Sequence, residues 1–250
     1  MSKRIDLNAD VGEGFASDEA LMEYITSANI ACGVHAGDEQ TMRLTARLAM
    51  RHGVALGAHP SLDDRANFGR LERPVTPDDV RVLVTKQVRT LQRLAATEGG
   101  ALRHLKPHGA LYHMAAHDPA LARAVAEAIY ALDRGLILFG LSGSASIREA
   151  RTLGLAVAEE AFVDRGYNRD GTLVNRSAPG AAIVCSETAA GRAVKMVQEH
   201  TVVTVDGTTI PLIADTLCIH GDAPHAAALA RTLRQELEKA GHVVVKVGTA

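Results

Sequence analysis

The sequence of 250 residues lacks the features that mark secreted or membrane-spanning proteins. It has three cysteines, Cys32, Cys185 and Cys218, an odd number at wide spacing that argues against a disulfide framework and for a reducing compartment. No apolar stretch approaches the roughly 20 residues needed to cross a bilayer. The N-terminal stretch loses its apolar character after Leu7, which does not fit a signal peptide. We therefore expect a cytoplasmic protein without membrane contact.

An excess of charge of one sign is also missing. The chain has 27 basic and 29 acidic residues, a formal net charge of -2, and no block of Lys or Arg. This balance gives no reason to expect binding to nucleic acid or to an anionic membrane. Apolar residues make up 47% of the chain, enough for an ordinary globular protein with a sizeable core.

Short apolar runs alternate along the chain with segments of helical period. The clearest helix is predicted over 77–97, where Thr76 suits the N-cap and Pro77 the first position. Further helices are predicted over 39–51, 119–132, 144–153, 187–198 and 224–240. Strands are predicted over 4–8, 29–32, 54–58, 102–106, 136–139, 156–162, 216–219 and 243–247.

This repeated alternation of strand and helix predicts an α/β fold with a parallel sheet. So many units in one chain favour closing the sheet into a barrel, although an open, doubly wound sheet is the alternative. Two segments break the rhythm: a long polar loop over 163–180 and a hairpin over 201–211 that turns at Asp206-Gly207. We find no linker or repeat, which predicts a single domain over 1–250.

Polar residues concentrate directly after the predicted strands. Because the carboxyl ends of barrel strands meet at one face, these residues are expected to converge on one site. They are Asn8, Asp10 and Glu13 after the first strand, His35 and Asp38 after the second, His59 after the third, Lys106 and His108 after the fourth, Asp164 and Arg165 after the sixth, and His220 and Asp222 after the seventh.

Asp10 and Glu13 form the best candidate for a general base. Two neighbouring carboxylates push their pKa values apart, although a salt-bridged rim is the alternative. Lys106 could neutralise an anion or polarise a carbonyl group, or it could be an ordinary lysine at the edge of the core. Asp38 and Asp222 precede predicted helices and suit N-caps as well as chemistry.

Histidines and arginines supply candidates for binding. His108 is grouped with the catalytic candidates, whereas His35, His59, Asp164 and His220 are predicted to contact substrate. In the long loop, Arg165 and Arg176 are candidates for gripping a carboxylate. A metal, if bound, would use Asp10, His35 and His59, but the sequence has no HExxH motif to support it.

Six short motifs together resemble the LamB/YcsF-like family, whose members are understood as the A subunits of ATP-dependent 5-oxoprolinases. They are DLNADVGEGF, ANIACGVHAGD, GAHPS, LKPHGALY, EEAFVDRGYNRDGTLVNR and CIHGD, in order from Asp6 to Asp222. The resemblance implies a distorted barrel of about seven strands, similar to sugar deacetylases. It also implies opening of 5-oxoproline to L-glutamate, coupled to hydrolysis of ATP to ADP and phosphate, together with partner subunits B and C.

The sequence leaves the place of ATP open. It has no GxxxxGK(S/T) phosphate loop and no GxGxxG motif after a strand, so the nucleotide site is either atypical or on a partner. Two other functions stay open. One is a metal-dependent carbohydrate deacetylase, which the 3% aromatic content and the absence of Trp disfavour. The other is a non-catalytic lactam-binding subunit.

Overall fold

Seven parallel strands close into a barrel in the computed structural model, which describes residues 4–176, 178–183, 185–221 and 225–248. Strand β9 pairs with both β6 and β1 and so completes the ring. This confirms the predicted barrel and rules out the open, doubly wound sheet. The strands are β1 (Arg4–Val11), β2 (Ser27–Ala31), β3 (Ala55–His59), β4 (Leu102–Leu105), β5 (Ile137–Leu141), β6 (Val157–Phe162) and β9 (Thr216–Ile219).

The eighth predicted run, 243–247, forms only the short strand β10 (Val243–Val244). It pairs with the first residues of β1 and lies outside the ring. Most strand ends agree with the prediction to within a few residues. The barrel therefore has seven strands, as predicted. The eighth predicted run pairs only with β1 and is not one of the strands of the ring.

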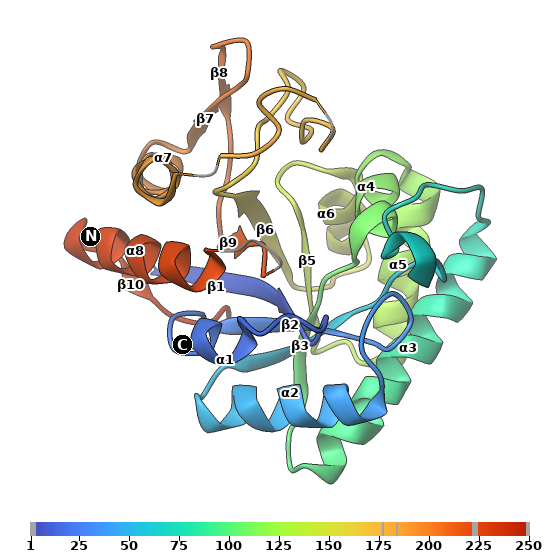
Figure 1. The fold of residues 1–250 in the computed structure, drawn as a ribbon. Helices are drawn as coiled ribbons and strands as arrows, with labels where there is room; N and C mark the ends of the chain where they lie inside the picture. Colours follow the sequence, from blue (N-terminus) through green and yellow to red (C-terminus); the bar gives the residue numbers. More distant parts are fainter. Residues whose placement is uncertain (1–3, 177, 184, 222–224, 249–250) are drawn as a thin grey trace.

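The predicted helices surround the barrel (Figure 1). They are α2 (Glu39–Arg51), α3 (Pro77–Thr97), α5 (Pro119–Leu132), α6 (Ala145–Thr152), α7 (Ser186–Glu199) and α8 (Ala226–Lys239). Thr76 caps α3 in a capping box with Asp79, and Asp38 caps α2. Asp222, the other expected cap, lies outside the described residues. None of the helices within the described ranges is long and apolar enough to cross a membrane.

Three helical segments were not predicted. They are α1 (Asp18–Leu21), the 3-10 turn η1 (Arg65–Asn67) and α4 (Gly109–His117). Helix α4 follows directly after Lys106-Pro107-His108, where Gly109 has a positive φ of 53°. A Cβ at Gly109 would come within 2.5 Å of the Gly69 carbonyl oxygen, so glycine permits this turn and fixes the position of His108.

The predicted hairpin is present as β7 (Thr201–Val203) paired antiparallel with β8 (Thr209–Pro211). It packs on the irregular loop that follows β6. The backbone N–H of Val205 donates to the Tyr167 carbonyl at 3.0 Å, and Arg169 lies 3.3 Å from Asp206. In Figure 1 the hairpin and this loop lie together at one end of the molecule, beyond the tip of β6.

Candidate active site

A cavity of about 710 Å³ opens at the carboxyl ends of the barrel strands, as the distribution of polar residues predicted. Most of the predicted site residues line it. They are Asp10, Glu13, His59, Lys106, His108, Arg165, Arg176 and His220. His35 and Asp164 lie behind this lining, where each contacts a lining residue.

Lys106 and Asp10 form a buried ion pair at one side of the cavity. The Lys106 Nζ lies 3.0 Å from Asp10 Oδ1, 2.9 Å from Glu160 Oε1 and 3.0 Å from Cys218 Sγ. Burial opposes the charge of Asp10, but His59 and Lys106 outweigh it and hold the pKa of Asp10 well below its ordinary value. Burial likewise disfavours the ammonium, yet Asp10 and its neighbours raise the pKa of Lys106 well above the usual range.

These contacts favour a positioning role for Lys106. An ammonium has three donors, and here four acceptors, on Asn8, Asp10, Glu160 and Cys218, lie within hydrogen-bond distance inside the protein. Lys106 lines the cavity but is only 2% exposed. The group is therefore better placed to keep Asp10 ionised than to polarise a substrate carbonyl.

Glu13 and three histidines form a compact cluster beside Asp10. Glu13 Oε1 lies 3.2 Å from His35 Nε2 and 3.4 Å from His108 Nδ1. His59 Nε2 lies 2.9 Å from His108 Nδ1 and 3.4 Å from Asp10 Oδ2. Burial, reinforced by His59, lowers the pKa of His35 to about 3 and that of His108 well below its ordinary value, so both rings are neutral near pH 7.

Backbone carbonyls fix the orientation of two of these rings. His59 Nδ1 lies 2.8 Å from the Lys106 carbonyl oxygen, and His108 Nε2 lies 2.8 Å from that of Phe68. A carbonyl oxygen only accepts, so both of these ring nitrogens carry hydrogen. Phe68 has a φ of 56°, a left-handed conformation that is strained for a non-glycine residue and recurs at functional sites.

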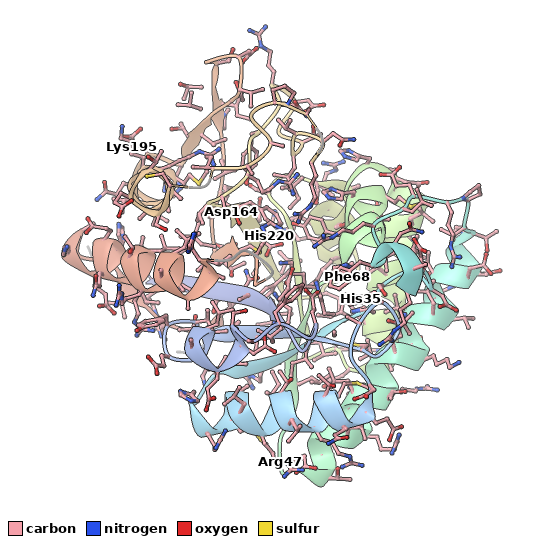
Figure 2. The ribbon with its side chains drawn as sticks, viewed as in Figure 1. His35, Arg47, Phe68, Asp164, Lys195 and His220 are labelled. Atoms are coloured by element: carbon pink, nitrogen blue, oxygen red, sulfur yellow. The ribbon has the colours of Figure 1, made fainter. Side chains whose placement is uncertain are left out.

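A second pair, His220 and Asp164, faces the cavity from the other side. His220 Nδ1 lies 2.9 and 3.0 Å from the two Asp164 oxygens, so Nε2 is the ring nitrogen not engaged by Asp164. Burial would raise the pKa of Asp164, but the charges of His220 and Arg165 outweigh it and lower the pKa. Figure 2 shows His220 beside Asp164, and His35 beside Phe68.

The two predicted carboxylate-binding arginines have different surroundings. Arg165 Nε donates to the Ala181 carbonyl at 3.1 Å, and its Nη2 donates to the Val174 carbonyl at 2.6 Å. Arg165 therefore braces the loop after β6. Arg176 lines the cavity. The pKa of Arg165 is lowered first by burial and second by the positive charge of Arg176. Two positive charges therefore lie close together at this rim. Such a rim suits an anionic ligand.

Sequence reasoning named Asn8 but missed its polar neighbours inside the barrel, Asn29, His104 and Glu160. Asn29 Nδ2 donates to Asp10 Oδ1 at 2.8 Å and to Asn8 Oδ1 at 2.7 Å, and Asn8 Nδ2 donates to Glu160 Oε1 at 3.0 Å. His104 lies 2.8 Å from Asn29 Oδ1. The alternation of polar residues along β1 was the available signal, because alternate residues of a barrel strand point inward.

The structure also groups the candidate metal ligands differently from the sequence prediction. Asp10, His35 and His59 were the predicted set. Among the described residues, the His, Cys, Asp and Glu side chains whose ligand atoms all lie within 4.8 Å of one another are Glu13, His35, His59 and His108. Asp10 lies beside this group.

The chain is thus a seven-stranded (β/α) barrel with a cavity lined by acidic and basic side chains at the carboxyl ends of its strands. The sequence profile of the LamB/YcsF family matches residues 5–250. The chain belongs to the LamB/YcsF family.

A solved structure supports this assignment. The chain is similar to a lactam utilization protein from Thermus thermophilus, with 44% identity, a TM-score of 0.91, and coverage of 97% of this chain and 99% of that one. A polysaccharide deacetylase from Bacillus cereus shares the fold, with 12% identity, a TM-score of 0.51, and coverage of 99% and 94%. At that identity the likeness concerns the fold alone.

Proposed function

We propose that this chain is the A subunit of an ATP-dependent 5-oxoprolinase, which opens 5-oxoproline to L-glutamate. The observation that carries the proposal is a cavity with ionised Asp10 on one side and His220, oriented by Asp164, on the other. Opening a lactam adds water to the carbonyl carbon and breaks the C–N bond. It therefore needs one group that orients the water and one that passes a proton to the departing amine.

Asp10 and Glu13 are the candidates for directing water. Asp10 is held by Lys106 and Asn29 through Oδ1, which leaves Oδ2 toward the cluster that includes His59. Its low pKa suits a carboxylate that orients water and takes up a proton only transiently. His220 is the candidate for protonating the amine through Nε2. The lactam carboxylate is expected to bind at the rim with Arg176.

ATP enters the proposal through partner proteins. An unstrained five-membered lactam needs a thermodynamic push, which phosphorylation of the lactam oxygen can supply. The sequence has no recognisable phosphate loop, so subunits B and C are expected to bind the nucleotide. They are expected to dock where the loop after β6 and the β7–β8 hairpin lie. The relative named for lactam utilization supports the substrate class.

The direct test combines the purified chain, 5-oxoproline and ATP, with glutamate and ADP as readouts. The lone chain should form no glutamate, and adding subunits B and C should start sustained turnover. Glutamate formation by the lone chain would place the nucleotide site on this chain. No turnover in any combination would contradict the proposal.

A metal-dependent carbohydrate deacetylase is the second candidate, favoured by the cluster of Glu13 with three histidines. Deacetylation also breaks an amide bond and would use the same cavity. Acetate release from an acetylated sugar by the lone chain, without ATP, would favour it. The remaining candidate is a non-catalytic subunit that only binds the lactam. Tight binding of 5-oxoproline by the complex, together with unchanged turnover after mutation of Asp10 and His220, would favour it.

A further inference from the structure

We infer that Glu13, His59 and His108 bind one divalent metal ion, best matched by zinc, with a fourth coordination position open to the cavity. All three residues line the cavity and are at least nine-tenths buried. Metal binding is a property of these residues by themselves. The role of the metal in activating water for lactam opening rests on the proposed function.

The nearest pair of nitrogen atoms in the cluster needs a metal ion or a proton between them. His59 carries hydrogen on Nδ1 and His108 on Nε2, because both nitrogens face backbone carbonyls. When neither of these two other nitrogens is protonated, each bears a lone pair, and the two nitrogens lie 2.9 Å apart. Two lone pairs at that distance repel each other unless a positive ion or a proton lies between them. Two carboxylates beside them, Asp10 and Glu13, add negative charge that a metal ion would balance.

The distances fit a small metal ion. Zinc binds imidazole nitrogen and carboxylate oxygen at about 2.0–2.2 Å, which places tetrahedral ligand atoms roughly 3.3–3.5 Å apart. Here the three separations are 2.9 Å between His59 and His108, 3.4 Å between His108 and Glu13, and 3.9 Å between His59 and Glu13. Small side-chain rotations equalise these distances around one ion.

His35 belongs to the cluster but is better placed as a positioning residue. Its ring stacks on His108 with centroids 3.8 Å apart and an angle of 3°, so the in-plane lone pairs of the two rings cannot converge on one ion. His35 Nε2 instead lies 3.2 Å from Glu13 Oε1 and can orient that carboxylate. His35 is absent from the lining of the cavity.

The contacts made by the second ring nitrogens of His59 and His108 are those expected at a metal site. Histidines that bind metal usually donate their second ring N–H to a carbonyl or carboxylate, which fixes the ring and its tautomer. His59 and His108 both do so, to the Lys106 and Phe68 carbonyls. The Phe68 carbonyl is presented by a backbone held at a φ of 56°. Two histidines, one glutamate and one open position form a ligand set used by catalytic zinc sites.

This arrangement assigns different tasks to the two carboxylates. Glu13 would hold the ion, and a water in the open position would become more acidic because the ion stabilises hydroxide. Asp10 lies beside the cluster, with Oδ2 3.4 Å from His59 Nε2, where it can accept a hydrogen bond from that water. The two carboxylates that the sequence offered as candidate bases thus become one ligand and one base.

The test measures metal binding without turnover. The full chain is stripped with a chelator, equilibrated with Zn²⁺ in competition with a chromophoric chelator, and analysed by mass spectrometry for bound metal. We expect one ion per chain. Glu13→Gln, His59→Gln and His108→Asn should each weaken binding by more than roughly 100-fold, and His35→Gln by roughly 10- to 100-fold, as expected for an outer partner.

His117→Gln is the matched control, because this exposed histidine lines the same cavity outside the cluster. It should keep wild-type affinity. Melting temperatures with and without Zn²⁺ guard against misfolding: wild type should be stabilised by the ion, whereas a folded ligand variant should not.

Absence of stoichiometric binding would overturn the inference and leave a shared proton between His59 and His108. Wild-type affinity in all three ligand variants would overturn the residue assignment. Failure of the proposed function is separable, because a chain that binds one zinc ion without supporting lactam opening keeps the metal site and loses only the reaction.

Discussion

Asp6 and Asp10 lie four residues apart on the same inward face of β1, yet their surroundings differ. Asp10, at the cavity end, contacts the Lys106 ammonium and lies close to His59. Asp6, at the opposite end, accepts hydrogen bonds only from the hydroxyl groups of Thr26, Ser27 and Thr216 among the described side chains. Asp6 is 1% exposed and Asp10 is 8% exposed, so both carry a desolvation cost.

The difference in counter-charge decides the ionisation of each group. Burial raises the pKa of Asp6 to about 6, and three hydroxyl hydrogen bonds do not offset it. Cations outweigh burial at Asp10 and lower its pKa. Asp10, at the cavity, therefore keeps its negative charge near neutral pH. Asp6, at the far end of the same strand, gains or loses its proton near pH 6. Position within the barrel, and not residue type, makes Asp10 a candidate for chemistry.

Removing the counter-charge should have the largest effect. Lys106→Met leaves Asp10 and Glu160 without their shared cation, and breaking a buried ion pair costs about 3–5 kcal/mol of unfolding free energy. Urea unfolding at pH 7 measures the loss. The exposed Lys86→Met should change stability by less than about 0.5 kcal/mol. A loss for Lys106→Met as small as that of the control would show that Asp10 is stabilised by other groups.

Neutralising Asp10 should affect turnover more than folding. Asp10→Asn in the complete complex should lower kcat by at least about 100-fold, because the carboxylate that orients water is lost. If Lys106 acts through Asp10, combining Asp10→Asn with Lys106→Met should lower kcat little further. Asp6→Asn is the matched control at the other end of β1 and should retain turnover. Unchanged turnover with a near wild-type melting temperature in Asp10→Asn would remove it from the mechanism.

Asp6 should give the protein an opposite pH dependence. Its folded pKa of about 6 exceeds the ordinary value of 3.8, so the native state holds the proton more tightly than the unfolded state. Stability should therefore fall as pH rises from about 4 to 6, by on the order of 3 kcal/mol, and then level off. Asp10, with its lowered pKa, contributes stability that is lost only as pH falls below about 4.

Unfolding measured between pH 4 and 8 checks this, with Asp6→Asn as the comparison. The variant should lack the fall in stability between pH 4 and 6. An identical pH profile in wild type and variant would show that Asp6 is ionised throughout this range.

The smallest effect is expected from one of the hydroxyl donors. Ser27→Ala removes a 2.7 Å hydrogen bond to Asp6 Oδ1. Since hydrogen bonds to charged groups are stronger, the loss should be about 1.5–3 kcal/mol above pH 6 and about 0.5–1.5 kcal/mol near pH 4. Urea unfolding at pH 4 and pH 7.5 measures both. Equal losses at the two pH values would contradict titration of Asp6.

Much of the fold was predictable because it rests on local periodicity. Short apolar runs identified the seven barrel strands and helical apolar periods identified six of the helices, and Thr76 and Asp38 fixed two helix starts. Helix α4 escaped prediction because Pro107, His108 and Gly109 resemble a loop in sequence, and only packing against Gly69 explains the turn.

The location of the candidate site was predictable from the sequence, but the contacts between its side chains were not. The chain order puts polar residues after successive strands, and a parallel barrel must bring those ends together. Which atoms meet depends on strand register and barrel closure, which no local pattern encodes. Lys106 therefore proved to be held by Asp10 and Glu160, and Arg165 by the carbonyls of its own loop.

The sequence by itself determined the family, the barrel and the face that carries the chemistry, because these follow from motifs and apolar periodicity. Tertiary structure alone decided the charge of the two β1 carboxylates and the meeting of Glu13, His59 and His108. The physical reason is that desolvation and electrostatic interaction depend on burial and on distances of a few ångströms between residues far apart in the chain.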